Sequence, residues 1–598
     1  MKLKHTFSAF LLGIAAFAFS GCQSVLDETP RTAFTIDYFK TQDGLQSAIY
    51  TAYAGLRYDF GPIGAMVLGN VGTDEFTYGD QGASGQTLEC GIYSISPTNG
   101  AIGTPWNRNY SNINLCNAVV EFAPNVTMDA TNKSKLLGEA RYLRAMYYLL
   151  LVENFGAVPL DLGSGDLKFN STPSCTFRRN DPDLLKKNFQ SMIDDLLFAT
   201  ENLPDQRPAG EYRLAKGAAL HLLARVYTYR AYSAVKQATD FQSAYDTAKK
   251  LIDGKAKYGT DLLQDFGDIH KEGNDYNKEI LFAVERLPLN NIANEVVNPS
   301  SDFDQKVNIS CNMFVSNYTS VTKNGVTLFP VRVLQYGRPL RQFCPTRWTL
   351  DVAFADKLND SRFNNTFRDA YPIATFYTAG SSDYTKYVAD MAAIGFALGD
   401  TAFYIAPTDA LAKTLKAANK KYVIYSPSET YSNQNRANNI YPALRKYEAV
   451  NRNSYQDISG RPFVASKFSE VYLLAAEAAM ALGKNAEAAQ YINVLRDRAA
   501  YRSGLSATEL ANRRAKIQVS ASDITLDFIL DERTRELCGE SIRWPDLAMR
   551  GKLVDRAKKY NPDVTNLQSF HLLRPIPQSQ LDATCETVKS QYQNPGYN

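Results

Sequence analysis

The sequence is short of several residue types that define whole classes of proteins. It has only four histidines and three tryptophans in 598 residues, and its formal net charge is +3. Because the charge is nearly balanced and no long basic run occurs, nucleic acid is not expected as a partner. After the N-terminal segment, no stretch approaches the 20 or so apolar residues that a membrane-spanning helix needs.

Cysteine is also scarce and scattered. The chain has eight cysteines and no C-x-x-C pair. The seven beyond Cys22 cannot all pair internally, so a disulfide framework is not predicted. His221, His270 and His571 show no ligand spacing, and a zinc site is equally unsupported. The seven cysteines are Cys90, Cys116, Cys175, Cys311, Cys344, Cys538 and Cys585.

The chain does begin with the pattern of an exported protein. A positively charged start precedes the apolar run AFLLGIAAFAF at residues 9–19, which has the length of a signal-peptide core. Two small residues then stand directly before Cys22, the arrangement that lipoprotein signal peptidase cleaves, although Phe19 replaces the usual leucine. We expect residues 1–21 to be a signal peptide and Cys22 to be the lipidated N-terminus. The alternative is an ordinary secretory signal with a chance cysteine.

Much of the remaining chain follows the 3.6-residue period of amphipathic helices. These helices come in pairs that are close enough in sequence to pack antiparallel, with alanine and glycine where the helices would cross. The pattern is typical of tetratricopeptide repeats, whose period is about 34 residues, but the pairs are degenerate, and generic helical hairpins are the alternative. The expected helices cover residues 43–56, 134–155, 183–202, 212–231, 240–254, 465–483, 485–500, 524–537 and 544–550.

Two regions lack this period. Residues 61–91 are rich in glycine and are expected to be irregular backbone. Residues from about 257 to 460 are rich in Asn, Ser, Thr and Tyr, with short strands expected at 279–285 and 327–336. An irregular section this long is usually functional or disordered. Its many aromatic residues argue against disorder.

Six blocks of sequence carry a family resemblance, and they occur in order along the chain. They are CQSVLDETP, LLGEARYLRAMYYLLLVENFGAVPL, LAKGAALHLLARVYTY, KFSEVYLLAAEAAM with INVLRDRAA, ILDERTRELCGESIRWPDLAMRGKL, and HLLRPIPQSQL with the terminal QNPGY. Together they resemble the SusD/RagB family of outer-membrane nutrient-uptake lipoproteins. Small departures are Phe19 before the cysteine, and Cys538 and Gly539 within ELCGE.

The resemblance implies a mainly α, α-superhelical fold with tetratricopeptide-like helix pairs and a loop-rich insertion with a few short strands. Residues 22–598 would form one compact unit, with an N-terminal part to about 235, an insertion at about 257–460 and a C-terminal helical part from about 461. It also implies an outward-facing, lipid-anchored outer-membrane protein that delivers a nutrient to a SusC-like TonB-dependent β-barrel transporter. The family is known for binding oligosaccharides, some members bind peptides, and it is not enzymatic.

A glycan site needs flat aromatic faces for sugar C–H groups, and amides or carboxylates for hydroxyls. Of the three tryptophans, Trp106 and Trp544 are expected to be core, whereas Trp348 is an even choice between packing and binding. Aromatic residues in loops are stronger candidates as a group, although each alone is more often a packing residue. The candidate ligand-binding residues are Asp74, Glu75, Phe76, Tyr78, Trp348, Tyr371, Phe376, Tyr377 and Tyr384.

Other kinds of site have weaker support. The acidic residues near Asp74 could hold a structural Ca²⁺, but they lack regular ligand spacing, so no cofactor is predicted. Asp531 and Glu532 can each pair with Arg535 on one helix, which favours a structural ion-pair network over catalytic carboxylates. The sequence shows no set of nucleophile, base and orienting group. Peptide uptake and a helical scaffold without a ligand are therefore the alternatives to glycan uptake.

Overall fold

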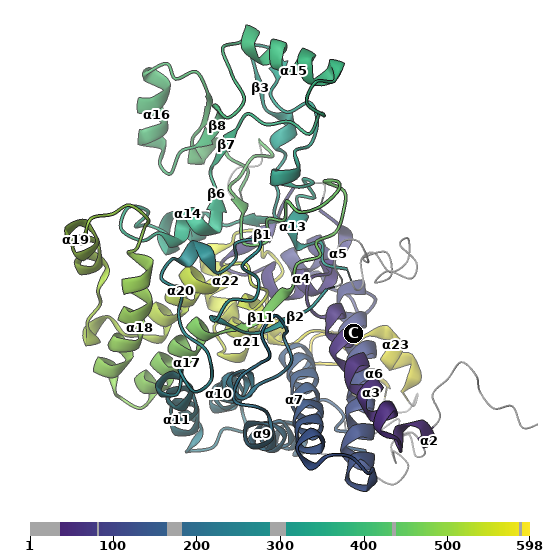
Figure 1. Ribbon diagram of the computed structural model, residues 1–598. Helices are drawn as coiled ribbons and strands as arrows, with labels where there is room; N and C mark the ends of the chain where they lie inside the picture. Colours follow the sequence, from purple (N-terminus) through teal and green to yellow (C-terminus); the bar gives the residue numbers. More distant parts are fainter. Residues whose placement is uncertain are drawn as a thin grey trace, which may run out of the picture.

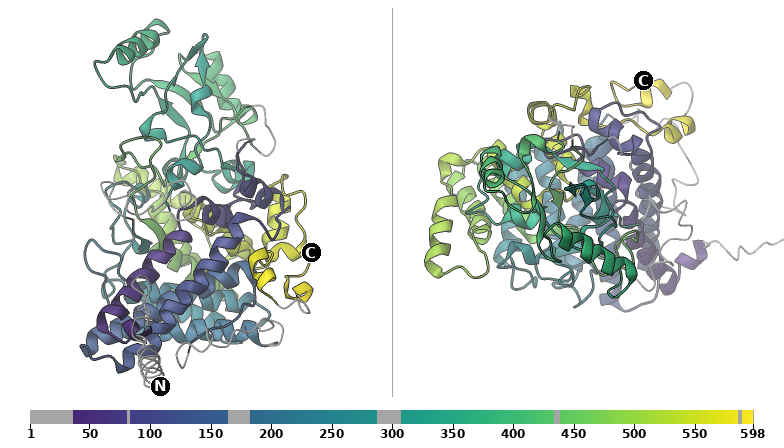
Figure 2. Two further views of the ribbon diagram at one scale, coloured as in Figure 1. Left: turned by 90° about the vertical axis from the view of Figure 1, so that its right-hand side faces the viewer. Right: turned by 90° about the horizontal axis from the view of Figure 1, so that it is seen from above.

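The computed structural model describes residues 36–80, 83–163, 182–286, 307–432, 438–584 and 589–597, and the predicted signal peptide and Cys22 lie outside these ranges. A helical body carries a smaller lobe that projects from it (Figure 1). The lobe stands clear of the body in a second view as well (Figure 2). The mainly α architecture with few short strands confirms the expected fold class. No helix in the described ranges is long and apolar enough to cross a membrane.

The body consists of helices that pack in pairs, among them α7 with α9, α10 with α11, and α17 with α18. The pairs also contact each other, α9 against α10 and α11 against α17. They occur where the apolar period predicted them. The main body helices are α3 (Gln42–Gly55), α6 (Gly100–Phe122), α7 (Ala130–Phe155), α9 (Leu184–Asn202), α10 (Lys216–Tyr232), α11 (Asp240–Asp253), α17 (Phe468–Ala481), α18 (Asn485–Ala499), α20 (Leu526–Leu537), α21 (Arg543–Met549) and α22 (Leu553–Tyr560).

The helix α17 shows why small residues recur in the sequence. It contacts α10, α11, α18 and α20, so it is surrounded on several sides. Ala475, Ala476, Ala478 and Ala479 are fully buried at these contacts. A larger side chain at such a position would force the neighbouring helices apart, at a cost of about 1–3 kcal/mol.

The glycine-rich stretch at 61–91 is not irregular, and that prediction is wrong. It forms α4 (Ile63–Asn70), β1 (Phe76–Tyr78) and α5 (Gly85–Ile92). Two of its glycines permit close packing: a Cβ on Gly69 would lie 2.2 Å from the Ser541 carbonyl oxygen, and one on Gly64 3.3 Å from the Ala101 Cα. Glycine lowers intrinsic helix propensity, but these tertiary contacts decide the structure here.

Buried ion pairs connect the C-terminal helices to the rest of the body. The guanidinium of Arg362, which is fully buried, lies 2.6 Å from the Asp360 carboxylate, 2.8 Å from Glu532 and 3.3 Å from Glu536. The surrounding arginines and lysines outweigh the effect of burial and hold the pKa of Glu536 at about 2. These carboxylates therefore stay ionised inside the protein, because each has a cationic partner.

A second group of ion pairs joins α17, α20 and α21. Arg533 lies 2.8 Å from the Glu470 carboxylate and 2.6 Å from Asp546. Arg550 pairs with Asp546 at 3.0 Å and with Glu477 at 2.6 Å. The network therefore links α17 to the later helices α20 and α21.

The predicted pairs within α20 are only partly formed. Arg535 does pair with Glu532, at 2.8 Å. Asp531 instead pairs with Arg556 of α22, at 2.5 Å. The i,i+4 spacing predicted a pair between Asp531 and Arg535. In the structure Arg556 of α22 pairs with Asp531 instead of Arg535.

The lobe comprises residues 315–341 and 369–432, and it has its own aromatic core. The Tyr371 ring stacks on Phe403 with centroids 4.2 Å apart, and Tyr318 and Tyr336 pack around them. This core orders a region whose composition suggested loops. Its elements are β3 (Thr322–Lys323), β4 (Val326–Thr327), β7 (Ala370–Pro372), α15 (Ser382–Ala393), β8 (Thr401–Ile405), α16 (Asp409–Ala417) and β9 (Val423–Tyr425), with the sheet order β7-β8-β9.

Short sheets connect the lobe to the body. β5 (Phe343–Pro345) pairs with β1, and β6 (Phe367–Arg368) pairs with β10 (Ala443–Leu444). Within the body, β2 (Ile280–Val284) pairs with β11 (Phe463–Lys467), which confirms the strand predicted at 279–285. The strand predicted at 327–336 is wrong, because residues 334–336 form a 3₁₀ turn.

We predict that Arg362→Met lowers the free energy of unfolding by about 3–5 kcal/mol, because it leaves buried carboxylates without a cation. Urea unfolding of the purified protein measures the change. Lys386→Met is the matched control, because its ion pair with Asp390 is exposed and exposed ion pairs contribute little to stability. Equal stability of the Arg362 variant and the wild type would contradict the structural role of the network.

Candidate functional site

Three of the predicted site residues, Asp74, Glu75 and Phe76, are buried beneath the lobe rather than exposed in a loop. Asp74 accepts hydrogen bonds from Arg543 of α21 at 2.6 Å and from Arg556 of α22 at 2.7 Å. Burial alone would raise the pKa of Asp74, but the two guanidinium groups outweigh it and lower the pKa below its ordinary value. The structure corrects the expectation that these residues contact a ligand, because β1 lies in the core.

The alternative of Ca²⁺ at this position meets the same obstacle. Both carboxylate oxygens of Asp74 accept from guanidinium groups, and burial raises the pKa of neighbouring Glu75 to about 7. A calcium site needs several ionised oxygens that are free to coordinate. Within the described ranges, no group of three or more His, Cys, Asp or Glu side chains is arranged to hold a metal ion.

The tryptophans also belong to the interior. Trp348 is buried, and its ring stacks on Tyr560 with centroids 4.9 Å apart. The Arg556 guanidinium lies 4.9 Å from the Trp348 ring, so this residue packs on the same ion pairs that hold Asp74. Trp106 and Trp544 are buried as expected. The structure therefore resolves Trp348 as a packing residue.

The predicted aromatic residues of the lobe separate into two kinds. Tyr371 is fully buried in the lobe core and is not available to a ligand, which corrects its assignment. Phe376 is 41% exposed. Tyr377 and Tyr384 are half-buried near the start of α15, as is Tyr78 at the end of β1.

Phe376 contacts Tyr455, and Tyr455 in turn contacts Arg332, so three separate segments meet here. The Phe376 ring lies edge-on to Tyr455, with centroids 5.6 Å apart, and the Arg332 guanidinium is 5.7 Å from the Tyr455 ring. Tyr455 comes from the segment at 446–460, which packs on the body, whereas Phe376 and Arg332 belong to the lobe. We call Arg332, Phe376 and Tyr455 the junction cluster, because they lie where lobe and body meet.

The junction cluster combines a guanidinium with aromatic rings at a partly exposed surface. Arg332 and Tyr455 are half-buried and Phe376 is exposed. Arg332 has no carboxylate or carbonyl acceptor within the part of the chain that the structure describes. Its donors therefore remain available for hydroxyl or acid groups of a ligand, next to two aromatic rings that offer apolar faces.

Sequence reasoning identified Phe376 but missed Arg332 and Tyr455. Arg332 occurs in the segment PVRVLQY, which suggested a strand. Tyr455 is a single aromatic residue in the polar segment NRNSYQD, which was a usable signal. Their meeting depends on how the chain passes back and forth between lobe and body, which no local sequence pattern predicts.

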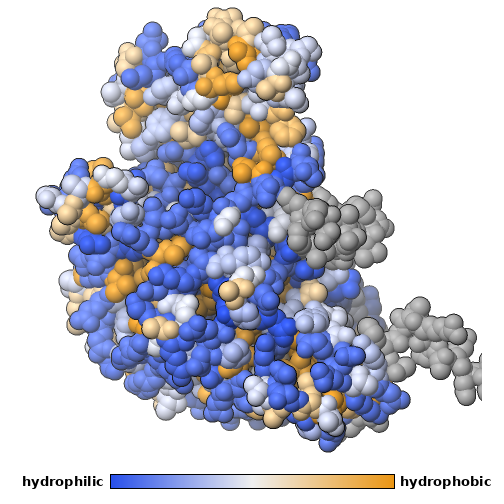
Figure 3. All heavy atoms as spheres, viewed as in Figure 1, coloured by the Kyte–Doolittle hydropathy of each residue, from blue (hydrophilic) through white to orange (hydrophobic). Residues whose placement is uncertain are grey.

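The surface shown in Figure 3 has few other apolar areas that could serve as a binding site in place of the junction cluster. The face shown in Figure 3 is largely hydrophilic, with separate small hydrophobic patches, several of them on the lobe. Exposed aromatic rings are rare among the described residues: Tyr50, Tyr276 and Phe376 are the ones with large exposed fractions.

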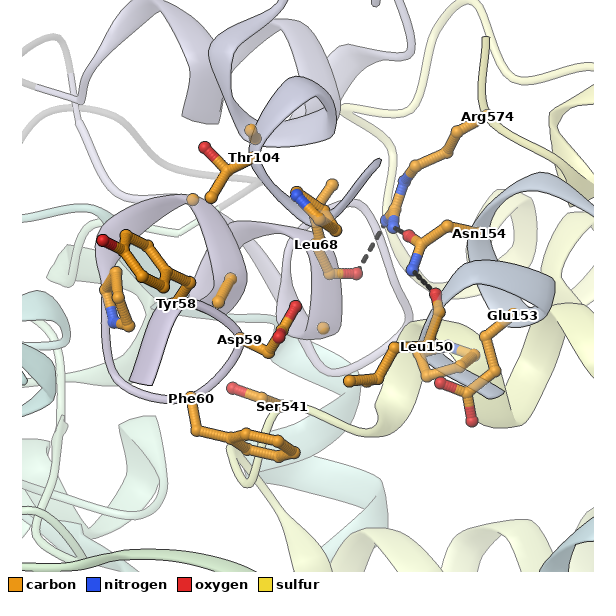
Figure 4. Close-up of a pocket in the computed structure, with 17 residues that line it drawn as sticks. Tyr58, Asp59, Phe60, Leu68, Thr104, Leu150, Glu153, Asn154, Ser541 and Arg574 are labelled. Atoms are coloured by element: carbon orange, nitrogen blue, oxygen red, sulfur yellow. Dashed lines mark hydrogen bonds between the residues drawn. The ribbon is translucent and has the colours of Figure 1, made fainter. Parts of the chain in front are cut away.

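A cavity of about 70 Å³ lies among α4, α6 and α7. Asp59 and Glu153 approach it from opposite walls, and Arg574 and Asn154 close one side (Figure 4). One oxygen of each carboxyl group has no hydrogen-bond partner among the described residues. Burial raises the pKa of Asp59 to about 7 and that of Glu153 to about 8. Glu153 is therefore a mostly neutral acid at pH 7.

Two family models match the chain. The SusD family matches residues 349–597, and the family described as "Starch-binding associating with outer membrane" matches residues 70–228. The chain belongs to the SusD/RagB family, as its motifs indicated. SusD-like protein P2 from Formosa agariphila is similar over the whole length, with 24% identity over 604 residues and 100% of both chains covered.

Solved structures show the same fold. Surface glycan-binding protein A from Bacteroides thetaiotaomicron has a TM-score of 0.63 at 20% identity, with 93% of this chain and 100% of that chain covered. The structure of that protein in complex with laminarihexaose gives a TM-score of 0.62 at 19% identity, with 93% and 99% covered. At these identities the likeness establishes the SusD-like fold.

We predict that Glu153→Gln makes stability less dependent on pH. The folded state favours the protonated acid up to about pH 8, whereas the unfolded chain ionises near its ordinary value of about 4.5. The wild type should therefore lose stability as pH rises through this window, by up to about 1.4 kcal/mol per pH unit. Glutamine resembles the protonated acid and removes this loss.

Thermal unfolding at about pH 5 and about pH 8 tests this linkage. The Tm of Glu153→Gln should rise relative to the wild type as pH increases. The exposed Glu201→Gln is the matched control. A Tm difference for Glu153→Gln that stays constant across the window would show that this carboxyl group does not carry the pH dependence.

Proposed function

We propose that this protein is a cell-surface lipoprotein that binds an oligosaccharide at the junction cluster and passes it to a SusC-like TonB-dependent transporter. The observation that carries the proposal is the cluster of Phe376, Tyr455 and Arg332, with an exposed ring and a guanidinium that has no acceptor among the described residues. Family membership and the structural neighbour in complex with laminarihexaose also support a glycan-binding function.

The mechanism is binding without chemistry. The rings of Phe376 and Tyr455 lie at a steep angle, with an interplanar angle of 76°. A sugar ring can therefore cover one aromatic face while its hydroxyls accept hydrogen bonds from Arg332. Because two of these residues belong to the lobe and one to the body-side segment, a bound glycan would bridge them.

The charged clusters of the described residues have structural partners, which supports a role without catalysis. Asp74, Glu532 and Asp546 are buried and bound to arginines. His221 and His270 contact the carboxylates of Glu470 and Glu540 at 2.8 and 3.2 Å. None of these groups faces the junction cluster as a paired nucleophile and base.

The membrane and transporter parts of the proposal rest on the sequence and the family. Cys22 follows a signal-like segment, and an N-terminal lipid with two or three acyl chains holds a protein firmly on a membrane. The body and lobe would then face the exterior, and the protein would cover the barrel of the transporter as a lid.

We predict that Phe376→Ala and Tyr455→Ala each weaken glycan binding about tenfold, the loss of about 1.4 kcal/mol expected for one aromatic contact. Isothermal titration calorimetry against hexasaccharides of β-1,3-glucan, starch and xylan, with a mixed peptide pool, measures the effect. The matched control is Tyr50→Ala, which removes another surface ring, 55% exposed, on α3.

The outcomes separate the candidate functions. Glycan binding that both variants lose and the control retains supports the proposed site. Peptide binding without a glycan signal would replace the glycan function with peptide uptake. No binding signal with any of these ligands would favour a scaffold role without a ligand.

We predict that Cys22→Ser releases the protein from the membrane. In cells that process lipoproteins, the wild type should incorporate a labelled fatty acid and partition into the detergent phase of Triton X-114. The variant should do neither, because it lacks the thiol that forms the thioether. A wild-type protein without label would show that the chain has an ordinary secretory signal.

A further inference from the structure

The helical body has an open hollow of about 280 Å³ at the start of α10. Its volume is close to the lower bound of about 300 Å³ for small-molecule sites. The hollow is lined by the loop at 206–210, the first turn of α10, the loop at 258–260 and the segment at 276–281 that leads into β2. None of the junction-cluster residues lines it, so it is a separate feature of the molecule.

One side of the hollow is an aromatic ring held in a fixed position. Tyr276 lines the hollow and is 42% exposed. Its ring stacks on Tyr212, with centroids 4.9 Å apart and an interplanar angle of 17°. The Tyr276 hydroxyl donates to the Glu285 carboxylate at 3.0 Å. A ring that is ordered before binding gives a flat apolar surface at little entropic cost.

The same loop carries a positive charge to the hollow. The Arg207 guanidinium lies 4.6 Å from the Tyr212 ring and donates to the backbone carbonyls of Tyr276 at 2.8 Å and Asn277 at 2.9 Å. These bonds fix the loop at 206–210 against the segment that bears Tyr276. Backbone carbonyls do not neutralise the guanidinium, so its charge remains.

Cationic side chains line the hollow and carboxylates do not. Arg207 and Lys278 are both lining residues, whereas Glu279, the carboxylate of the segment at 276–281, is fully buried, and Glu211 and Glu285 beside these segments do not line the hollow. Two aspartates nearby are each shared by two lysines. Asp205 lies 2.9 Å from Lys216 and 3.8 Å from Lys257, and Asp261 lies 2.8 Å from Lys255 and 3.7 Å from Lys278.

The hollow also offers a neutral hydrogen-bonding group. Gln206 lines it and donates its amide N–H to the Lys257 carbonyl at 3.0 Å. Its amide oxygen has no donor within the described part of the chain, so it can accept from a ligand hydroxyl. An apolar ring, an amide acceptor and an excess of cations therefore converge on one concave surface, as in sites for charged polar ligands.

We propose that this hollow is a second carbohydrate-binding site, which takes a sugar unit that carries a carboxylate or sulfate group. The Tyr276 ring contacts the sugar C–H face, Gln206 accepts from a hydroxyl, and Lys278 and Arg207 attract the acid group. The ligand class rests on the proposed glycan-binding function, but the residues are different from those of the junction cluster.

Calorimetry with tetragalacturonate, a sulfated carrageenan tetrasaccharide and neutral laminarihexaose tests the proposal on the purified protein. We expect at least one acidic oligosaccharide to bind more tightly than the neutral one, and to lose affinity as salt concentration rises. Tyr276→Ala and Lys278→Gln should each weaken that binding about tenfold, the loss of one aromatic or charge-assisted contact. Comparing the affinities for tetragalacturonate and the carrageenan tetrasaccharide shows whether the site prefers a carboxylate or a sulfate group.

Matched variants distinguish this site from the junction cluster. Tyr50→Ala and Lys249→Gln remove a surface ring and a surface cation elsewhere, and both should bind as the wild type. Tyr276→Phe keeps the ring and should retain most of the affinity, which separates binding from misfolding.

Failure of this proposal differs from failure of the proposed function. The second site is overturned if neither acidic oligosaccharide binds, or if acidic binding is lost in Phe376→Ala and unchanged in Tyr276→Ala. In either case neutral glycan binding at the junction cluster is unaffected. Conversely, acidic binding that Tyr276→Ala abolishes supports the hollow even when Phe376→Ala changes no affinity.

Discussion

Arginine–carboxylate pairs buried between helices are the constraint on which the rest of the structure depends. Asp74 precedes β1 and is held by Arg543 and Arg556, from two helices near the C-terminus. β1 in turn pairs with β5, through which the chain returns from the lobe. Because an unpaired buried charge costs several kcal/mol, these pairs allow few other arrangements of β1. They therefore fix the base from which the lobe projects.

The lobe uses a different principle. Its interior is a set of aromatic rings around Tyr371 and Phe403, with only short strands and two helices at the surface. Such a core tolerates long loops, since large rings bury much area with little backbone order. Phe376 lies outside this core and reaches Tyr455 of the segment that packs on the body. Lobe and body thus share the surface that we propose as the glycan site.

The sequence predicted the body well because its helices carry a strong apolar period and a family-wide order of motifs. It predicted the candidate site poorly. Asp74, Phe76 and Trp348 occur in segments whose composition is typical of loops, but strand pairing and partner arginines place them in the core. Burial of this kind is set by residues hundreds of positions away. Arg332 and Tyr455 were missed for the same reason, because their neighbours in space are remote in the chain.

The central claim is that a glycan occupies the surface shared by lobe and body. A crystal structure of the protein bound to the oligosaccharide that it prefers would test this most directly. We expect a sugar ring against Phe376 or Tyr455, with a hydroxyl within hydrogen-bond distance of the Arg332 guanidinium, about 2.7–3.2 Å. A glycan seated elsewhere, with these three side chains free of contact, would contradict the account.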